Sequence, residues 1–486
     1  MRSCGILLPV FSLPTKYGVG TLGEQAYRFI DFLSRAGQRY WQMLPLCPTH
    51  VGDSPYQSFC DKAGNPYFID LELLCKDGLL TSDECEKSRL DDAVIDYATI
   101  YKCRYPLLRK AFKRFVPDKK FYDFYKEQPW VKDYALFMAI KESMGGIAWN
   151  EFPEPLRLRE KDALKKCFQS LANETEFHAF LQYVFYNQWK KLRLYATSKN
   201  IKIIGDIPIY VGYDSADVWC YPKQFDLNEQ GLPNSVAGCP PDAFSPRGQL
   251  WGNPIYNWKF MEIDGFSWWI SRMEHAFGLY DTVRIDHFRG LESYYAVPYG
   301  ADDASVGAWK PGPKNKLISA LRQRFGDMPI IAEDLGYMTD EVRAFLQSSG
   351  FPGMKVLQFA FDDREESDHL PHRFERNCVV YTGTHDNETL VGWCRTAPEK
   401  TIDLARQYSG ATSSRELPDA LIRLALQSVA DTAVIPMQDW LNLDNSARIN
   451  TPGTLGNNWK WRLKFGQLTN DLAHHIYRQT ALYGRI

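Results

Sequence analysis

The sequence has no apolar run close to the roughly 18 residues that a membrane-spanning helix needs. It also lacks a charge excess, because 57 Lys and Arg residues stand against 59 Asp and Glu residues, for a formal net charge of −2. A general nucleic-acid binder needs a basic surplus to displace counterions from phosphates. We therefore predict no nucleic-acid partner and no membrane association.

The cysteines follow no disulfide or zinc pattern. There are 11 of them, an odd number, scattered along the chain without a C-x-x-C pair. Such spacing is typical of free thiols in a reducing cytosol. The first residues form an apolar stretch that Pro9 interrupts, so we expect no signal peptide and a cytoplasmic location. No cluster of metal-ligand residues is evident, and no cofactor is expected, although a structural calcium and the oligomeric state stay open.

Aromatic residues are plentiful. With 45% hydrophobic, 14% aromatic and 24% charged residues the chain can build an ordinary packed core. The 14 Trp and 27 Tyr residues either pack that core or stack on the apolar faces of sugar rings. Composition does not decide between these two uses.

Short apolar runs rich in β-branched residues alternate with segments of helical periodicity. The runs are Ile6–Pro9, Tyr40–Pro45, Ile201–Val211, Thr282–Asp286, Pro329–Glu333, Lys355–Phe359, Val379–Gly383 and Ala433–Met437. The helical segments are Glu24–Arg35, Phe266–Phe277, Lys316–Phe325, Asp340–Gln347 and Pro418–Ala430. Alternation of strands and helices predicts an α/β fold with a parallel sheet, and eight such units predict a closed TIM (β/α)8 barrel. Continuously apolar runs are typical of strands that are covered on both faces.

The spacing of these runs predicts large insertions between strands. About 155 residues separate the second run from the third, far more than an ordinary βα connection. Much of this interval is charged and aromatic with helical periodicity, which predicts a helical insertion over about residues 75–200. The region of about residues 212–264 is rich in Pro, Gly, Asn and Trp and predicts a long structured loop. We expect residues 1–486 to form a single barrel domain that carries both insertions.

One glycine motif suggests a nucleotide site and fails on its context. Residues Gly18–Gly23 match G-x-G-x-x-G and precede a helical segment. A dinucleotide site also needs a strand running directly into the first glycine and an acidic residue about 20 positions further on. Pro14–Tyr17 precede the motif, and the following run, Tyr40–Pro45, ends without Asp or Glu. We interpret the motif as a glycine-rich βα loop.

Three carboxylates stand where a barrel carries its catalytic groups. Asp286 and Glu333 end the fourth and fifth apolar runs, and Asp386 follows the seventh. The carboxyl ends of barrel strands converge on one substrate. Any one of the three could instead cap a helix in a βα loop. Three together favour a shared site.

The neighbours of these carboxylates suggest distinct roles. Two carboxyl groups on either side of a glycosidic bond can act as nucleophile and as acid/base. Arg284 lies two residues before Asp286 on the same strand, so both side chains point to one side and the guanidinium can keep Asp286 ionised. Arg284 could equally serve as a structural ion pair within the barrel. A proton donor at Glu333 requires a raised pKa, which nothing local in the sequence establishes.

These residues carry a resemblance to a known family. Residues 283–287, 332–336 and 384–387 resemble, in this order, conserved regions of the α-amylase superfamily, and the chain is more specifically similar to the amylomaltases, the 4-α-glucanotransferases or disproportionating enzymes. The closer resemblance rests on residues 17–23, 40–45, 54–58, 205–211, 214–219, 240–254, 448–453 and 458–459. The match covers essentially the whole chain. Where typical amylases carry a histidine near the position of Asp206, this chain has Tyr210 and Val211, which speaks against a plain α-amylase.

The resemblance implies the roles of individual residues. Asp286 would be the nucleophile, Glu333 the acid/base and Asp386 a third carboxylate that grips sugar hydroxyls. It further implies a set of substrate-binding residues: Arg284, His385, Tyr56, Trp251, Asp242 and Asn458. Without the resemblance, an ordinary loop histidine is the favoured explanation of His385. The implied substrates are α-1,4-glucans, that is, maltooligosaccharides and amylose-type chains.

The expected activity is a retaining transfer of α-1,4-glucan segments to the 4-hydroxyl of an acceptor, through a covalent glucosyl-enzyme in a single catalytic barrel domain. A glucan hydrolase on the same barrel is the nearest alternative, since only the acceptor, water or sugar, distinguishes the two. A non-catalytic glucan-binding protein is a second alternative. Donor and acceptor length, cyclisation of long glucans and the ratio of transfer to hydrolysis do not follow from the sequence.

Overall fold

A parallel barrel forms the centre of the molecule. The computed structural model describes residues 2–90, 94–241, 245–362 and 367–486. Its barrel strands are β1 (Ser3–Leu7), β2 (Tyr40–Gln42), β3 (Lys202–Ile207), β6 (Thr282–Ile285), β9 (Ile330–Ala332), β10 (Gly353–Val356), β11 (Cys378–Tyr381) and β12 (Thr432–Pro436). They pair in parallel in the order β10-β11-β12-β1-β2-β3-β6-β9. The amide of Ala332 donates to the carbonyl of Pro352 at 2.9 Å, which joins β9 to β10. The predicted (β/α)8 barrel is confirmed.

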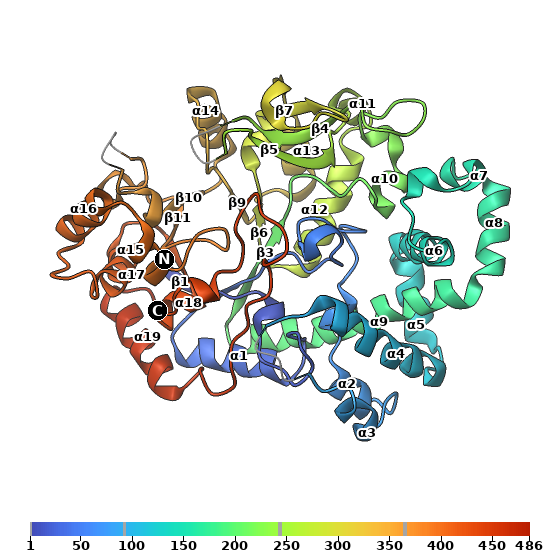
Figure 1. The fold of residues 1–486 in the computed structure, drawn as a ribbon, viewed down its shortest axis with the longest axis horizontal. Helices are drawn as coiled ribbons and strands as arrows, with labels where there is room; N and C mark the ends of the chain where they lie inside the picture. The colour runs from blue at the N-terminus through green and yellow to red at the C-terminus, as the bar shows by residue number, and fades with distance from the viewer. Residues whose placement is uncertain (1, 91–93, 242–244, 363–366) are drawn as a thin grey trace.

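Helices cover the outside of this barrel (Figure 1). They are α1 (Glu24–Arg35), α12 (Ser267–Leu279), α13 (Asn315–Phe325), α14 (Asp340–Ser349), α15 (Leu390–Thr396), α16 (Glu399–Ser409), α17 (Leu417–Gln427), α18 (Met437–Trp440) and α19 (Asn470–Leu482). Helix α1 shows why they form: Ala26, Phe29, Ile30 and Leu33 recur every three or four residues and bury one face against the strands. The two ends of the chain lie together, and Arg485 donates to the carbonyl of Ser3 at 3.0 Å.

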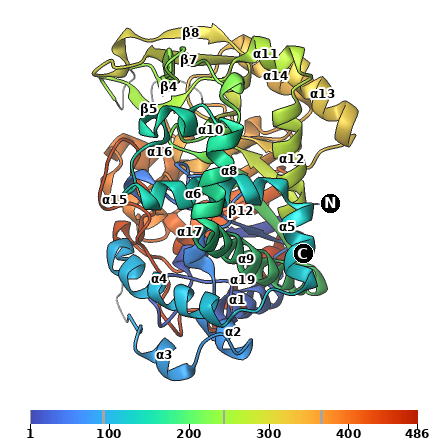
Figure 2. The ribbon, with the colours of Figure 1, turned by 90° about the vertical axis from the view of Figure 1, so that its right-hand side faces the viewer.

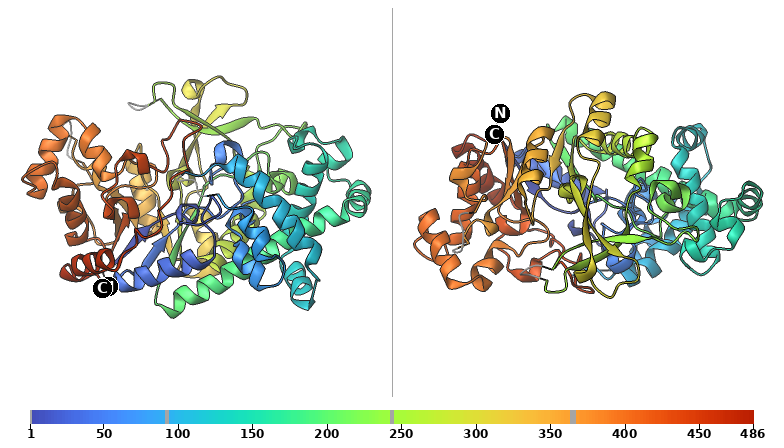
Figure 3. Two further views of the ribbon diagram at one scale, coloured as in Figure 1. Left: turned by 60° about the horizontal axis from the view of Figure 1, so that its bottom comes forward. Right: turned by 90° about the horizontal axis from the view of Figure 1, so that it is seen from above.

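A group of helices lies between β2 and β3 and extends away from the barrel (Figures 1 and 2). It comprises α2 (Leu71–Lys76), α3 (Ser82–Glu86), α4 (Tyr97–Arg114), α5 (Lys119–Glu127), α6 (Pro129–Ser143), α7 (Glu154–Arg157), α8 (Lys161–Ser170) and α9 (Ala172–Ser198). Helix α9 contacts α6 within this group and also contacts α1 and β3 of the barrel. The last helix therefore ties the group to the barrel wall. The view from above shows the group at one end of an elongated molecule (Figure 3).

A second sheet lies over one side of the barrel, and two of its four strands, β4 and β5, fall in the region of about residues 212–264 where we expected a loop. Its strands β4 (Ser235–Cys239), β5 (Gln249–Pro254), β7 (Ser293–Pro298) and β8 (Ala308–Pro311) pair antiparallel in the order β5-β4-β7-β8. Short helices α10 (Ala216–Cys220) and α11 (Trp258–Ile263) flank β4 and β5 in the chain. Val236, Tyr295, Val297 and Ala304 form a small core of their own. The pairing of β4 with β7 joins segments that lie before and after β6 in the chain, and a local sequence pattern does not reveal such a pairing.

Two glycines lie where the backbone packs closely against other parts of the chain. The sixth strand begins at Gly353, two residues before the expected start, and a Cβ at this position would lie only 2.6 Å from Asp334 Oδ2. In the Gly18–Gly23 motif, a Cβ on Gly20 would lie 1.8 Å from the carbonyl oxygen of Val10. These glycines therefore permit close packing of the chain.

None of the helices within the described ranges has the length and apolarity that a membrane crossing requires.

Candidate active site

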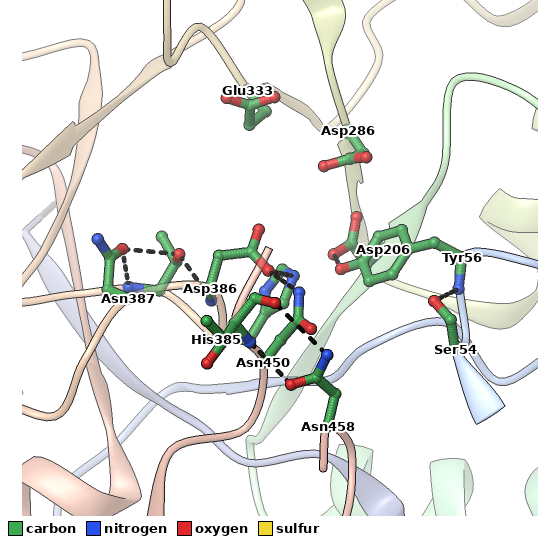
Figure 4. Close-up of polar contacts among 12 residues, drawn as sticks. Ser54, Tyr56, Asp206, Asp286, Glu333, His385, Asp386, Asn387, Asn450 and Asn458 are labelled. Atoms are coloured by element: carbon green, nitrogen blue, oxygen red, sulfur yellow. Dashed lines mark hydrogen bonds and ion pairs between the residues drawn. The ribbon is translucent and has the colours of Figure 1, made fainter. Parts of the chain in front are cut away.

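Three neighbouring barrel strands bring acidic side chains to one end of the barrel (Figure 4). Asp206 lies near the end of β3, while Asp286 and Glu333 directly follow β6 and β9. The register places Asp206 beside Arg284, and Arg284 beside Ile331. Because the carboxyl ends of parallel strands meet at the same edge, the three carboxyl groups converge although they are far apart in sequence.

Arg284 joins two of these carboxylates. Its Nη1 lies 2.7 Å from both oxygens of Asp206, and its Nη2 lies 2.9 Å from Asp286 Oδ1. Burial alone would lower the pKa of Arg284, but the charges of Asp206 and Asp286 raise it well above its usual value. The guanidinium therefore stays charged and holds the Asp286 carboxylate in one orientation. The Asp286 side chain remains 28% exposed, so its other face is open to a ligand.

Glu333 has the opposite environment. It is 7% exposed, and burial, followed by the nearby charge of Asp286, raises its pKa to about 8. Arg284 and two backbone amides act in the other direction: Leu335 N donates to Oε1 at 2.7 Å and His287 N donates to Oε2 at 2.6 Å. The net result is a carboxyl group that is protonated at neutral pH. Two carboxyls with such different environments can divide the roles of nucleophile and proton donor.

His287 connects the end of β6 with the second sheet. It follows Asp286 and has a φ of 48°, in the left-handed region, which turns its backbone amide toward Glu333. Burial lowers the pKa of its imidazole to about 4, so the ring is neutral. The ring of Trp251, on β5, stands edge-on to it, with centroids 4.8 Å apart. The second sheet thus contributes an aromatic side chain, Trp251, to the site.

Asp386 faces Asp286 and Glu333 from another part of the barrel (Figure 4). Asn450 Nδ2 donates to its Oδ1 at 2.6 Å, and His385 Nε2 lies 3.3 Å from the same oxygen. The Asp386 side chain is 40% exposed, and in Figure 4 its other oxygen points toward Asp286 and Glu333. One oxygen is therefore held by the protein, while the other is available to a ligand.

Tyr56 lies between Asp206 and His385 and contacts both. Its hydroxyl donates to Asp206 Oδ2 at 2.7 Å, and its ring stacks on that of His385 with centroids 5.3 Å apart and planes 13° apart. The adjacent Gln57 donates to the carbonyl of Trp251 at 3.2 Å and to Asn253 Oδ1 at 3.1 Å. The loop after β2 consequently links Asp206, His385 and strand β5.

Two of the expected binding residues stand apart from the others. The side-chain amide of Asn458 makes hydrogen bonds within its own loop: Oδ1 accepts from Thr451 N at 3.0 Å, and Nδ2 donates to the carbonyl of Thr454 at 2.9 Å. It lies beside Asn450 in Figure 4 and shapes the loop that supports Asp386. Asp242 lies outside the described residues. The structure brings the remaining expected residues together: Asp286, Glu333, Asp386, Arg284, His385, Tyr56 and Trp251.

Sequence reasoning missed several members of the site. Asp206 is only 1% exposed and binds Arg284, and its signal was available: it is a carboxylate inside an otherwise apolar strand. Asn450 lies 64 residues from Asp386, and although it falls within the 448–453 stretch that carries the resemblance, nothing in the sequence linked it to Asp386.

Together these groups can carry out chemistry at an acetal carbon. Within the described ranges no group of three His, Cys, Asp or Glu side chains is placed to hold a metal ion. An oriented carboxylate, a protonated carboxyl and hydroxyl-binding groups are what retaining cleavage of a glycosidic bond requires.

Comparisons with known proteins cover nearly the whole chain. A family model described as 4-alpha-glucanotransferase matches residues 8–469. The chain is 49% identical over 483 residues to a 4-alpha-glucanotransferase of Clostridium butyricum, covering 98% of this chain and 99% of that relative. It is 44% identical over 500 residues to the chloroplastic/amyloplastic 4-alpha-glucanotransferase of Solanum tuberosum, covering 100% of this chain and 87% of that relative. The solved amylomaltase of Streptococcus agalactiae in complex with acarbose superposes with a TM-score of 0.97 at 40% identity, and 100% of each chain is covered.

Proposed function

The chain belongs to the 4-alpha-glucanotransferase family and transfers α-1,4-glucan segments from a donor to an acceptor glucan, and we propose that it does so by a retaining double displacement. One observation supports this mechanism above the others. Asp286 is held by the Arg284 guanidinium at 2.9 Å, whereas burial raises the pKa of Glu333 to about 8. A nucleophile must be ionised and a general acid must be protonated, and these two environments favour those states at the same pH.

In the first step an Asp286 oxygen attacks the anomeric carbon of the donor. The glycosidic C–O bond breaks, and the Glu333 proton passes to the departing 4-oxygen. The products of this step are a shortened glucan, a covalent glucosyl ester on Asp286 and an ionised Glu333. In the second step Glu333 takes the proton of an incoming 4-hydroxyl, whose oxygen displaces Asp286. Both carboxylates return to their starting states, and the anomeric configuration is retained.

The surrounding residues are proposed to bind the glucan. Asp386, held by Asn450 at 2.6 Å, presents its other oxygen to sugar hydroxyls, and His385 orients it. Tyr56 and Trp251 offer aromatic faces to sugar rings. For Asn458 and Asp242, direct contact with substrate stays a prediction.

Transfer in place of hydrolysis requires that water be kept from the ester while a sugar is admitted. Trp251, Gln57 and Asn253 form a hydrogen-bonded link that holds β5 over the site. We infer that this link supports the exclusion of water. The preferred substrates are proposed to be maltooligosaccharides and amylose-type chains.

The organisation and location of the protein are proposed on other grounds. We propose one catalytic barrel domain over residues 1–486, with a helical insertion over about residues 75–200 and a substrate-covering region over about residues 212–264. The scattered cysteines support a cytoplasmic location, in which the protein would contact neither membrane nor nucleic acid.

Incubation with pure maltotriose tests the proposal. We expect glucose plus a series of longer maltooligosaccharides, with a nearly constant number of reducing ends. The Asp286→Asn variant serves as the control and should yield neither. A steady rise in reducing ends, with only glucose and maltose accumulating, would identify a hydrolase instead.

A further inference from the structure

Two cysteine side chains meet at the edge of the helical insertion, far from the site described above. Cys75 lies near the end of α2, Cys85 lies in α3, and their Sγ atoms are 3.0 Å apart. A disulfide bond is about 2.05 Å long, so the two sulfur atoms need to approach by only about 1 Å. Helices α2 and α3 lie at the lower edge of the molecule in Figures 1 and 2, away from the second sheet.

We infer that Cys75 and Cys85 form an oxidisable dithiol site, which a peroxide converts to a disulfide that locks α2 to α3. This inference does not depend on the proposed mechanism. It concerns a covalent modification of this chain and the opening of one helical hairpin.

The backbone on both sides of the pair is fixed, so the sulfur atoms are held toward each other. Asp70 caps α2 by accepting from Leu73 N at 2.9 Å. Thr81 and Glu84 form a capping box on α3, with hydrogen bonds of 3.0 and 3.3 Å. The turn between the helices is closed by Leu79 N, which donates to the carbonyl of Leu74 at 2.9 Å.

The hairpin is also tied to its surroundings at both ends. Arg114 of α4 donates two hydrogen bonds to Glu84, of 2.6 and 2.8 Å. Lys16, in the loop after β1, lies 3.6 Å from Glu72 of α2 and 3.9 Å from Glu86 of α3. A disulfide would therefore form without moving either helix out of its place.

The two thiols differ in access, which sets the order of the reaction. Cys85 is 2% exposed, whereas Cys75 is partly exposed. Burial, followed by its hydrogen bond with Cys75, raises the pKa of the Cys85 thiol, so this sulfur stays protonated. Cys75 is the sulfur that an oxidant in solution reaches first.

The step balances with hydrogen peroxide as the oxidant. The Cys75 thiol releases its proton, and the thiolate attacks one peroxide oxygen; the O–O bond breaks, and the departing hydroxide takes up that proton, so a sulfenic acid and one water result. The Cys85 sulfur then attacks the Cys75 sulfur, and the departing hydroxide takes the Cys85 proton to become a second water. Two thiols and one peroxide thus yield one disulfide and two waters.

The lock would act on local opening of the hairpin. Cys75 and Cys85 are separated by 10 positions, and in the chain-entropy treatment a cross-link closing such a loop disfavours the open state about 100-fold. The amides of α2 and α3 should therefore exchange their hydrogens up to about 100-fold more slowly in the oxidised protein. Transferase activity should be unchanged because neither helix contributes to the active site.

The test compares reduced protein with protein treated with one equivalent of hydrogen peroxide. Trypsin cleaves after Lys76 and Lys87, so residues 63–76 and 77–87 separate unless a disulfide joins them. We expect the joined pair of peptides, a mass lower by two hydrogen atoms, and slowed exchange in α2 and α3. The Cys75→Ser variant should lose all three effects, and Cys103→Ser, which removes a cysteine on α4, should retain them.

Two results would overturn the inference. One is recovery of the two peptides as separate species after the peroxide is consumed, with Cys75 carried to the sulfinic acid. The other is a joined peptide pair with unchanged hydrogen exchange in α2 and α3. The peptide map of the unmutated protein decides the first point even if Cys75→Ser folds poorly.

Discussion

Replacing Glu333 by glutamine should remove the alkaline limb of the pH profile. Burial and the charge of Asp286 raise the pKa of Glu333 to about 8. The acid form, which donates the proton, is therefore present below about pH 8 and is lost as the pH rises through that value. By this arithmetic about nine-tenths of the enzyme carries the proton at pH 7 and about one-tenth at pH 9. The value of kcat/KM should fall about tenfold between these two points.

The assay is the initial rate of glucose release from dilute maltotriose between pH 6 and pH 10. Under these conditions the rate reports kcat/KM and hence the free enzyme. Glu333→Gln should lower this value by about 10²–10⁴-fold and flatten the remaining profile above pH 7. The loss should be much smaller with an α-maltosyl fluoride donor, because fluoride departs without a proton. Glu341→Gln, at the exposed start of α14, is the matched control and should keep the limb.

An alkaline limb with the same midpoint in Glu333→Gln would show that another group titrates there. Equal losses of activity with maltotriose and with the fluoride would show that Glu333 does not protonate the leaving oxygen. Stability offers an independent check with a defined sign. The folded protein keeps the Glu333 proton to about pH 8, whereas an unfolded glutamate releases it near pH 4.5. The unmutated protein should therefore lose stability relative to Glu333→Gln as the pH rises between these values.

Three further predictions follow from the same contacts. Asp286→Asn should abolish transfer from maltotriose while leaving the circular dichroism and the melting temperature nearly unchanged; substantial turnover would contradict its role as nucleophile. Arg284→Met should destabilise the fold by about 3–5 kcal/mol in urea unfolding, because the buried carboxylate of Asp206 loses the guanidinium that balances its charge and keeps only the Tyr56 hydroxyl; a change below about 1 kcal/mol would show that Asp206 does not depend on the guanidinium. Tyr56→Phe keeps the ring but removes the 2.7 Å hydrogen bond to Asp206, so the transition-state free energy calculated from kcat/KM should rise by about 1.5–3 kcal/mol. Tyr56→Ala also removes the ring and should raise this free energy further. Equal losses in the two Tyr56 variants would exclude a contribution from the ring.

The barrel was predictable because each strand carries its own signal. Strands such as β11 and β12 are mostly apolar and buried along nearly their whole length, so a short window of sequence identifies them. The second sheet carries no comparable signal. Strand β8 is exposed throughout, and β4 contains a glycine and an irregular register opposite β5. Their pairing depends on contacts between distant segments, which no local pattern encodes.

The candidate site divides in the same way. Asp286, Glu333 and Asp386 were found because they follow apolar strands, and the position of Arg284 two residues before Asp286 follows from the alternation of side chains in a strand. The bond from Arg284 to Asp206 depends on the register between β3 and β6. The support that Asn450 gives to Asp386 depends on how a loop 64 residues away returns to the barrel.

The sequence by itself determined the eight strands, the order of the carboxylates along the chain and the identity of the charged neighbour of Asp286. Those features are local, since strand propensity and side-chain alternation act over a few residues. Only the tertiary structure decided which carboxyl keeps its proton. The pKa of Glu333 rises because the fold removes it from water and brings it near Asp286, while Arg284 keeps Asp286 paired. Desolvation and charge proximity are properties of the assembled site, so the division of chemical roles between two otherwise similar carboxyl groups appears only when the chain is folded.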